Sequence, residues 1–139
     1  MERKKRTYTE SVEKLRNVGL KPTRQRIALA NILFSKGFRH IKAEDLYNEA
    51  ISENIKVSLA TIYNCLHQFT EAGLLREIKI DSTCSYFDTN LEPHHHYYFE
   101  KSKRVEDIII DYKTSTITLP EPPQGGKIRT IDIVARVDA

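Results

Sequence analysis

The sequence predicts an α+β fold in which a helical first part is followed by a strand-rich second part. Up to Gly73, apolar residues recur at the spacing of amphipathic helices, and beyond it the spacing becomes that of strands. The polar stretch TNLEP, residues 89–93, then separates the first part from the run HHHYYFE. We therefore predict two domains, residues 1–88 and 94–139, joined by a linker at residues 89–93.

The first domain is predicted to contain four helices. Thr9, Thr23 and Ser58 are good N-cap residues, and Gly19 and Gly73 are good stops. The predicted helices span residues 10–18, 24–35, 42–54 and 58–73.

Strands are predicted to end the first domain and to build the second. The turn Asp81-Ser82-Thr83 joins the first two strands into a hairpin, and PEPPQGG interrupts the chain before the last strand. The predicted strands span residues 74–80, 84–89, 94–100, 105–112, 115–119 and 127–137. A second domain of this size, close to the lower limit of about 40 residues and with exposed strand edges, is expected to pair with another copy. We therefore predict a dimerisation domain.

Composition and the first residues limit where the protein works. The chain has 139 residues, of which 40% are hydrophobic, so it can bury a core. No apolar run approaches the roughly 18 residues of a membrane span, and MERKKRTYTE lacks the apolar stretch of a secretory signal. We expect a cytoplasmic protein with no membrane partner. Its two cysteines, Cys65 and Cys84, form no CxxC pair and are expected to stay reduced.

Two short helices followed by a hairpin are typical of a winged helix-turn-helix. In the fourth helix, Leu59, Ile62, Leu66 and Phe69 form an apolar stripe. The opposite face is small, uncharged and rich in hydrogen-bonding groups, as a helix in the DNA major groove requires. That face carries Ala60, Thr61, Asn64, His67 and Gln68.

Basic residues gather at the start of the chain. Residues 1–26 hold nine Lys and Arg against three Asp and Glu, and Lys21, Arg24 and Arg26 begin the second helix. Such residues suit DNA phosphates. A solvated basic tail on a helical interaction domain is the alternative interpretation.

The run EPHHHYYFE, residues 92–100, contains three of the five histidines. In an extended strand, His94 and His96 share one face about 6.6 Å apart, whereas His95 points away. The three therefore cannot all ligate one ion, although His94 and His96 can. An inert surface pair is the alternative.

Several motifs together resemble the ferric uptake regulator family of bacterial transcription factors. They are GLKPTRQRIALANIL, HIKAEDLY, VSLATIYNCLHQFTEAGLL and SYFDT followed by HHH, in order and over nearly the whole chain. The phrases ATIYNCLHQFTEAGLLRE and HHHYYFE are most similar to the iron response regulator branch. The resemblance implies a homodimer that binds a palindromic double-stranded operator. It also implies that Tyr63 contacts DNA. The full predicted DNA-binding set is Lys21, Thr23, Arg24, Arg26, Ser58, Ala60, Thr61, Tyr63, Asn64 and His67.

The family also implies a regulatory metal site at the hinge between the domains. The positions that match its pattern are His40, Asp88, His94, His96 and Asp107. Histidines and carboxylates without a thiolate suit Fe(II), Mn(II) or Zn(II), with iron or manganese favoured.

The sequence departs from the family in four places. Phe99 and Ser102 stand where relatives have a CxxC, so we predict no structural zinc site built from four cysteines. His95 replaces an Asp of many relatives, which leaves a second metal site incomplete. PEPPQGG replaces a helix, so the packing of the dimer is open. Without a Cys-Pro motif, haem would have to bind His94, His95 or His96.

The predicted function is a dimeric transcription regulator, not an enzyme. The branch implies control of haem-synthesis and iron genes when iron is scarce, ended by haem or by its delivery from the terminal enzyme of haem synthesis. The alternative is a Mn(II)-, Fe(II)- or peroxide-sensing regulator that never binds haem. A metallohydrolase is a third interpretation, but the chain has no HExxH and no evident general base. The native metal, the operator and the role of His95 remain open.

Overall fold

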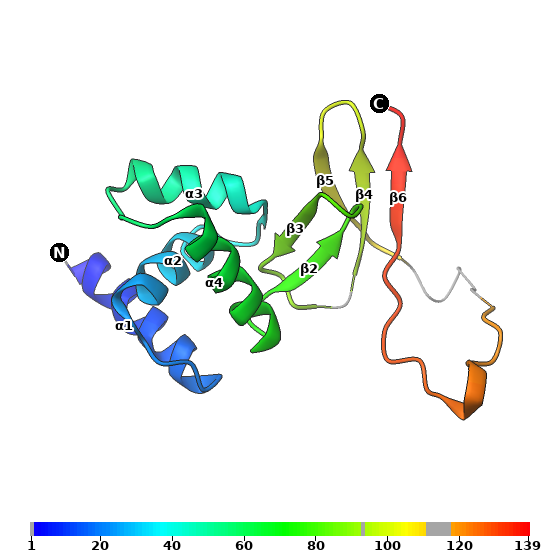
Figure 1. Cartoon of the computed structure of the whole chain (residues 1–139), viewed down its shortest axis with the longest axis horizontal. Helices are drawn as coiled ribbons and strands as arrows, with labels where there is room; N and C mark the ends of the chain where they lie inside the picture. Colours follow the sequence, from blue (N-terminus) through cyan, green and yellow to red (C-terminus); the bar gives the residue numbers. More distant parts are fainter. Residues whose placement is uncertain (1, 93, 111–117) are drawn as a thin grey trace. The chain divides into compact units, whose positions relative to one another are not determined.

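The computed structural model describes residues 2–92, 94–110 and 118–139, with side chains from residue 8 onward. The chain divides into two compact units, Met1–Leu91 and Glu92–Ala139, and this division falls inside the stretch predicted as a linker. The predicted α+β class is confirmed, because the described residues form four α-helices and two small sheets (Figure 1). None of the helices described is both long and apolar enough to cross a membrane.

The four helices of the first unit are α1 (Glu2–Asn17), α2 (Arg24–Phe34), α3 (Ala43–Ser52) and α4 (Leu59–Glu71). Two predicted caps are confirmed: Thr23 Oγ1 accepts a hydrogen bond from the Arg26 amide at 3.3 Å, and Ser58 Oγ accepts one from the Thr61 amide at 3.1 Å. The prediction that Thr9 caps the first helix is wrong, since α1 begins at Glu2. Residues 2–9 contain no glycine or proline, so nothing in them stops the helix from extending.

The helices of the first unit enclose its hydrophobic core. Fully buried side chains come from all four helices and from the strands that follow. They include Leu15, Leu29, Leu33, Leu46, Ile62, Leu66, Phe69 and Phe87. The predicted apolar stripe of α4 needs one correction, because Leu59 is 38% exposed whereas Cys65 is 5% exposed. Leu59 is the first residue of α4, and the stripe becomes buried only from Ile62 onward.

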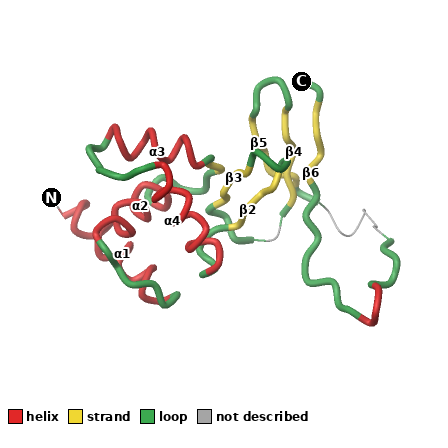
Figure 2. Tube along the Cα trace, viewed as in Figure 1, coloured by secondary structure: helices red, strands yellow, loops and turns green. Residues whose placement is uncertain are grey.

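A three-stranded sheet completes the first unit, in the order β1-β3-β2. Its strands are β1 (His40–Ile41), β2 (Arg76–Lys79) and β3 (Ser85–Asp88). Strands β2 and β3 form the predicted hairpin (Figure 2). Strand β1 pairs antiparallel with β3, so that His40 lies opposite Asp88. We did not predict β1, because two residues are too few to display an alternating pattern.

The second unit contains a separate three-stranded sheet, in the order β5-β4-β6. Strand β4 (His95–Phe99) pairs antiparallel with β5 (Arg104–Ile108) and parallel with β6 (Val134–Val137). A short 3-10 turn, η1 (Pro123–Gly125), lies inside PEPPQGG. Among the described residues of this unit, Tyr98 is the one buried hydrophobic side chain, so the sheet has little core of its own.

Three strand predictions in this unit change. The strand predicted for residues 105–112 is β5, which ends at Ile108, and the described residues 109 and 110 are not in a strand. The strand predicted for residues 127–137 is confined to Val134–Val137, because these are the residues that pair with His96–Phe99 of β4. Residues 127–132 are exposed, so their alternating pattern has no sheet to face. The strand predicted for residues 115–119 lies largely outside the described residues, and its described part, residues 118 and 119, is not in a strand.

Candidate metal and nucleic-acid sites

The first unit carries a pair of candidate metal ligands where its sheet ends. Because β1 and β3 pair in register, His40 Nε2 lies 3.3 Å from Asp88 Oδ2. Asp88 is only 1% exposed, and its Oδ1 accepts a hydrogen bond from the Asn90 amide at 2.9 Å. A buried carboxylate is costly unless cations or donors compensate its charge. His40 and Asp88 therefore form one half of a candidate site, which we call the first half-site.

The second unit carries three further candidate ligands, which we call the second half-site. His96 lies opposite Asp107 in the β4–β5 pairing, and His94 precedes β4 on the same face. Asp107 Oδ1 lies 3.1 Å from His94 Nε2 and 3.5 Å from His96 Nε2. The two imidazole rings have centroids 4.4 Å apart. The predicted convergence of His94 and His96 is thus present within this unit.

Hydrogen bonds at the Nδ1 atoms distinguish His94 from His95. His94 Nδ1 donates to the Glu92 carbonyl oxygen at 2.5 Å, so a neutral His94 keeps a lone pair on Nε2 for a metal. Metal-binding histidines commonly use their other ring nitrogen in this way. His95 Nδ1 instead accepts a hydrogen bond from the Ile133 amide at 3.1 Å, so a neutral His95 carries its proton on Nε2. While that bond persists, neither nitrogen of His95 offers a lone pair to a metal.

The donor atoms within each half-site fit a divalent ion. Two atoms that bind one ion at about 2.1 Å lie about 3.0 Å apart in octahedral and about 3.4 Å apart in tetrahedral geometry. The spacings of 3.1, 3.3 and 3.5 Å match this range. Neither half-site alone supplies enough ligands for a closed site, since one offers two donors and the other three.

The cysteines contribute no ligand to either half-site. Cys65 lies in the core of the first unit, where burial raises the pKa of its thiol to about 12. Such a thiol stays protonated at neutral pH and is inert as a nucleophile or ligand. Cys84 is partly exposed and lies beside β3.

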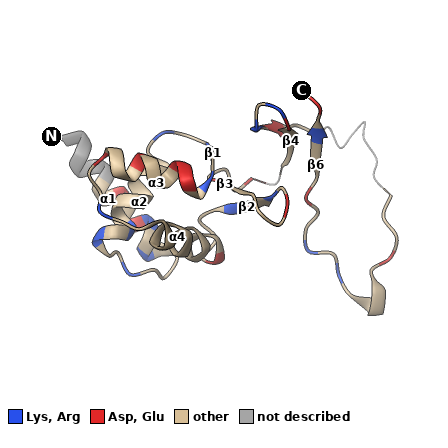
Figure 3. Cartoon of the chain, turned by 45° about the horizontal axis from the view of Figure 1, so that its top comes forward, with Lys and Arg blue, Asp and Glu red and all other residues tan. Residues whose placement is uncertain are grey.

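Helix α4 presents an uncharged surface, as the sequence predicts. Figure 3 shows α4 in tan along most of its length, because Glu71 is its one charged residue. Ala60, Asn64 and His67 are exposed, on the side away from the buried stripe. A helix of this kind can enter the major groove without repelling phosphates.

Some of the predicted DNA-binding side chains already have partners in the protein. Thr23 and Ser58 cap helices. Arg26 donates to the Lys21 carbonyl oxygen and to Gln68 Oε1, both at 3.0 Å, and so connects the start of α2 to α4. Lys21 and Arg24 are exposed. Arg26 therefore has hydrogen bonds within the protein, which the prediction from its charge did not include.

A sequence model of the ferric uptake regulator family matches residues 17–131. The chain belongs to the ferric uptake regulator family. The ferric uptake regulation protein of Bordetella parapertussis is 40% identical over 81 residues, which make up 58% of each chain. The peroxide-responsive repressor PerR of Staphylococcus epidermidis is 34% identical over 98 residues, 70% of this chain and 65% of that protein. The chain thus spans about three fifths of the length of the curated relatives it matches.

Solved structures of ferric uptake regulators have the same fold. The ferric uptake regulator of Pseudomonas aeruginosa, solved with manganese, is 27% identical with a TM-score of 0.70, over 91% of this chain and 96% of that one. The ferric uptake regulator of Vibrio cholerae has a TM-score of 0.72 at 21% identity, over 92% of this chain and 98% of that one. The region that matches the ferric uptake regulator family contains both half-sites and the exposed face of α4.

Proposed function

We propose that this protein is a homodimeric transcription regulator whose DNA binding depends on a divalent metal shared by its two units. The proposed ligands are His40, Asp88, His94, His96 and Asp107. The observation that carries the proposal is the presence of two incomplete half-sites with ligand spacing, one in the unit that holds α4 and one in the unit that follows it.

The linker allows the two half-sites to meet. His94 follows Asp88 by six residues, so the two residues can never be farther apart than about 21 Å. Ligation of one ion by residues of both units would restrict their relative orientation. In a dimer, that restriction would set the spacing between the two α4 helices, and this spacing must match the half-sites of a palindromic operator. DNA affinity would then depend on metal occupancy.

The donor set favours manganese or ferrous iron. Imidazole nitrogens and carboxylate oxygens without a thiolate suit these ions, and zinc would compete for the same atoms. The Pseudomonas aeruginosa relative solved with manganese supports the same choice.

The second unit is proposed to be the dimer interface. Its described residues bury little apolar surface, and several large hydrophobic side chains remain exposed. These include Ile109 at 96%, Ile128 at 50%, Leu119 at 44% and Ile131 at 41%. Among the described strands of this sheet, β5 and β6 lie at the edges. A second copy would cover both the apolar side chains and an edge.

The finer proposal concerns the signal. The phrases ATIYNCLHQFTEAGLLRE and HHHYYFE support an iron response regulator role, in which the protein controls haem-synthesis and iron genes and responds to haem. The terminal enzyme of haem synthesis would then be its partner. Because His95 is committed to Ile133, haem would use His94 or His96, the same atoms as the metal. Haem and manganese should therefore compete.

A regulator that senses metal or peroxide without haem is the second candidate. The 34% identity to a peroxide-responsive repressor supports it. Haem titration separates the two candidates. A Soret shift that saturating manganese suppresses, and that His94→Ala/His96→Ala abolishes, is expected for haem sensing. No Soret shift would leave the haem-free regulator, and a shift unchanged in that variant would exclude haem ligation by His94 and His96.

The proposed function is tested with one variant from each unit. His40→Ala and His96→Ala are compared with wild type for manganese binding and for binding to an operator selected from random duplexes. Both variants should lose manganese affinity and manganese-dependent DNA binding together. Normal manganese binding by His40→Ala would contradict a shared site. His67→Ala, on α4, serves as the control, because it should lose DNA affinity and keep manganese affinity.

A further inference from the structure

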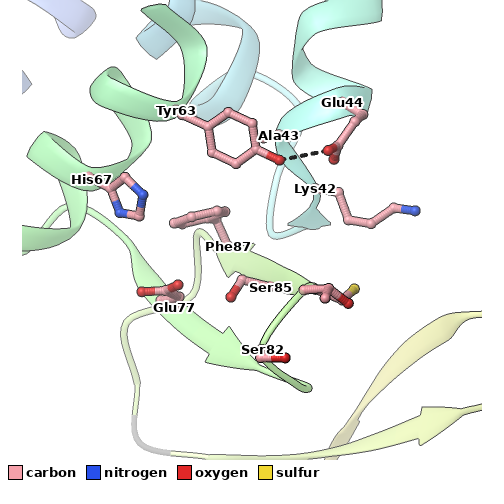
Figure 4. Close-up of a pocket in the computed structure, with 11 residues that line it drawn as sticks. Lys42, Ala43, Glu44, Tyr63, His67, Glu77, Ser82, Ser85 and Phe87 are labelled. Carbon is pink, nitrogen blue, oxygen red and sulfur yellow. Dashed lines mark hydrogen bonds between the residues drawn. The ribbon is translucent and has the colours of Figure 1, made fainter. Parts of the chain in front are cut away.

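The hydroxyl of Tyr63 points into a polar pocket in the first unit. The pocket has a volume of about 320 Å³ and is lined by the start of α3, the exposed side of α4 and the β2–β3 hairpin. Figure 4 shows Tyr63 and His67 reaching from α4 toward Glu44 and Phe87. Tyr63 is 38% exposed, so its ring also faces solvent, on the helix proposed to read DNA.

Glu44 holds the hydroxyl end of Tyr63. The phenol hydroxyl donates a hydrogen bond to Glu44 Oε1 at 2.6 Å, which is short because the acceptor is a carboxylate. This bond lowers the pKa of the Glu44 carboxyl and raises the pKa of the Tyr63 hydroxyl. Glu44 also lies in the first turn of α3, where the helix dipole favours a negative charge. The pair therefore consists of an ionised Glu44 and a protonated Tyr63 at neutral pH.

Neighbouring rings restrain the other end of Tyr63. Its ring stacks on His67, with centroids 6.5 Å apart and planes 25° apart. His67 in turn meets Phe87 of β3 edge-on, with centroids 6.1 Å apart. The phenol is thus held at the hydroxyl by α3 and along its ring by contacts that lead to the hairpin.

We propose that Glu44 is a positioning residue that determines base specificity through Tyr63, and this inference rests on the proposed DNA-binding function. A phenol has one hydroxyl hydrogen, and here it is engaged in the hydrogen bond to Glu44. The hydroxyl oxygen can then only accept hydrogen bonds from DNA. In the major groove the donors are adenine N6 and cytosine N4, whereas guanine N7 and O6 and thymine O4 are acceptors. Tyr63 should therefore select a donor group, and without Glu44 it should tolerate acceptors as well.

Charge alone predicts a different outcome. If Glu44 acted only by repelling phosphates, its loss would strengthen binding to every sequence alike. Glu44→Gln separates the two effects, because the amide oxygen can still accept the Tyr63 proton while the charge is gone. Asp45→Ala is the matched control, since Asp45 is exposed in the same first turn of α3 and carries the same charge.

The test is selection from a random duplex library, with saturating manganese present, by wild type, Glu44→Ala, Glu44→Gln, Asp45→Ala, Tyr63→Phe and Glu44→Ala/Tyr63→Phe. Thermal unfolding first verifies that each variant is folded. Wild type, Glu44→Gln and Asp45→Ala should share one preference. In Glu44→Ala, the preference for a base with a donor group over a base with an acceptor should fall about fivefold to tenfold at one symmetric pair of operator positions. In the Tyr63→Phe background, Glu44→Ala should change nothing further.

Three results would overturn the inference. They are a Glu44→Ala preference identical to that of wild type, a Glu44→Gln preference as relaxed as that of Glu44→Ala, or a Glu44→Ala effect that persists in the Tyr63→Phe background. A wild-type protein that enriches no sequence would overturn the proposed DNA-binding function itself.

Discussion

Replacing the adjacent histidines one at a time separates metal ligands from the structural residue between them. His96 Nε2 lies 3.5 Å from Asp107 Oδ1 in the second half-site, whereas His95 Nδ1 accepts a hydrogen bond from the Ile133 amide. Changing a residue that merely orients a metal ligand lowers affinity about 10–100-fold. Loss of a direct ligand should therefore lower manganese affinity at least about 100-fold, or about 2.8 kcal/mol. His96→Ala should show this loss, and His95→Ala should not.

His95→Ala should act on stability instead. It leaves the part-buried Ile133 amide without its acceptor, which should cost about 1 kcal/mol, the lower end of the range for buried groups. The exchange protection of the β6 amides should fall, because β6 follows Ile133 directly. His95→Asn is the matched control, since the amide oxygen can stand in for Nδ1. Isothermal titration with manganese and amide hydrogen exchange measure the two effects. If His95→Ala weakens manganese binding as much as His96→Ala, the tautomer argument is wrong.

Three further predictions concern reactivity, pH and assembly. In the native protein, iodoacetamide should modify Cys84 and leave Cys65 intact, because burial raises the Cys65 pKa to about 12; mass spectrometry of modified peptides measures this, and equal rates would contradict it. The Arg39 guanidinium, with Lys36, holds the pKa of Glu49 below its ordinary 4.5, so the pair stabilises the protein above that pH and the contribution is lost as pH falls through the folded pKa. At pH 7 the free energy of unfolding in urea should be about 0.5–1 kcal/mol higher for wild type than for Glu49→Gln, and this difference should shrink below pH 4.5. A difference that stays constant with pH would count against the pairing. Ile109→Lys should raise the dimer dissociation constant at least about tenfold in sedimentation equilibrium, whereas Ile51→Lys, on α3 of the first unit, should not. An unchanged dimer dissociation constant in Ile109→Lys would show that Ile109 is not part of the dimer interface.

Much of the helical fold follows from local signals. Thr23 and Ser58 mark helix starts because their hydroxyls satisfy amides of the first turn, and that chemistry is visible in sequence. The start of α1 cannot be seen in the sequence in this way, because its first residues carry no capping signal and merely lack glycine and proline. Strand β1 is also invisible locally, since two residues become a strand only through pairing with β3.

The candidate sites likewise combine features that local sequence predicts with contacts between residues far apart in the chain. The spacing of His94 and His96 predicts a shared face, whereas the commitment of His95 depends on Ile133, 38 residues away. Sequence reasoning missed Glu44 for a similar reason, because the packing of α3 against α4 brings it to Tyr63, 19 residues away. No local pattern records such contacts. The pairing of His40 with Asp88 was expected only from the family resemblance, and the strand register gives it a physical basis.

Metal binding is expected to control sequence-specific DNA binding by this protein. The most direct measurement is the affinity of the purified full chain for its selected operator at about 150 mM salt, where binding driven by charge alone is weak. It is made with saturating manganese and after chelation, beside a scrambled duplex. We predict that manganese strengthens operator binding at least about tenfold and leaves scrambled-duplex binding unchanged. Equal operator affinity with and without manganese would contradict the account.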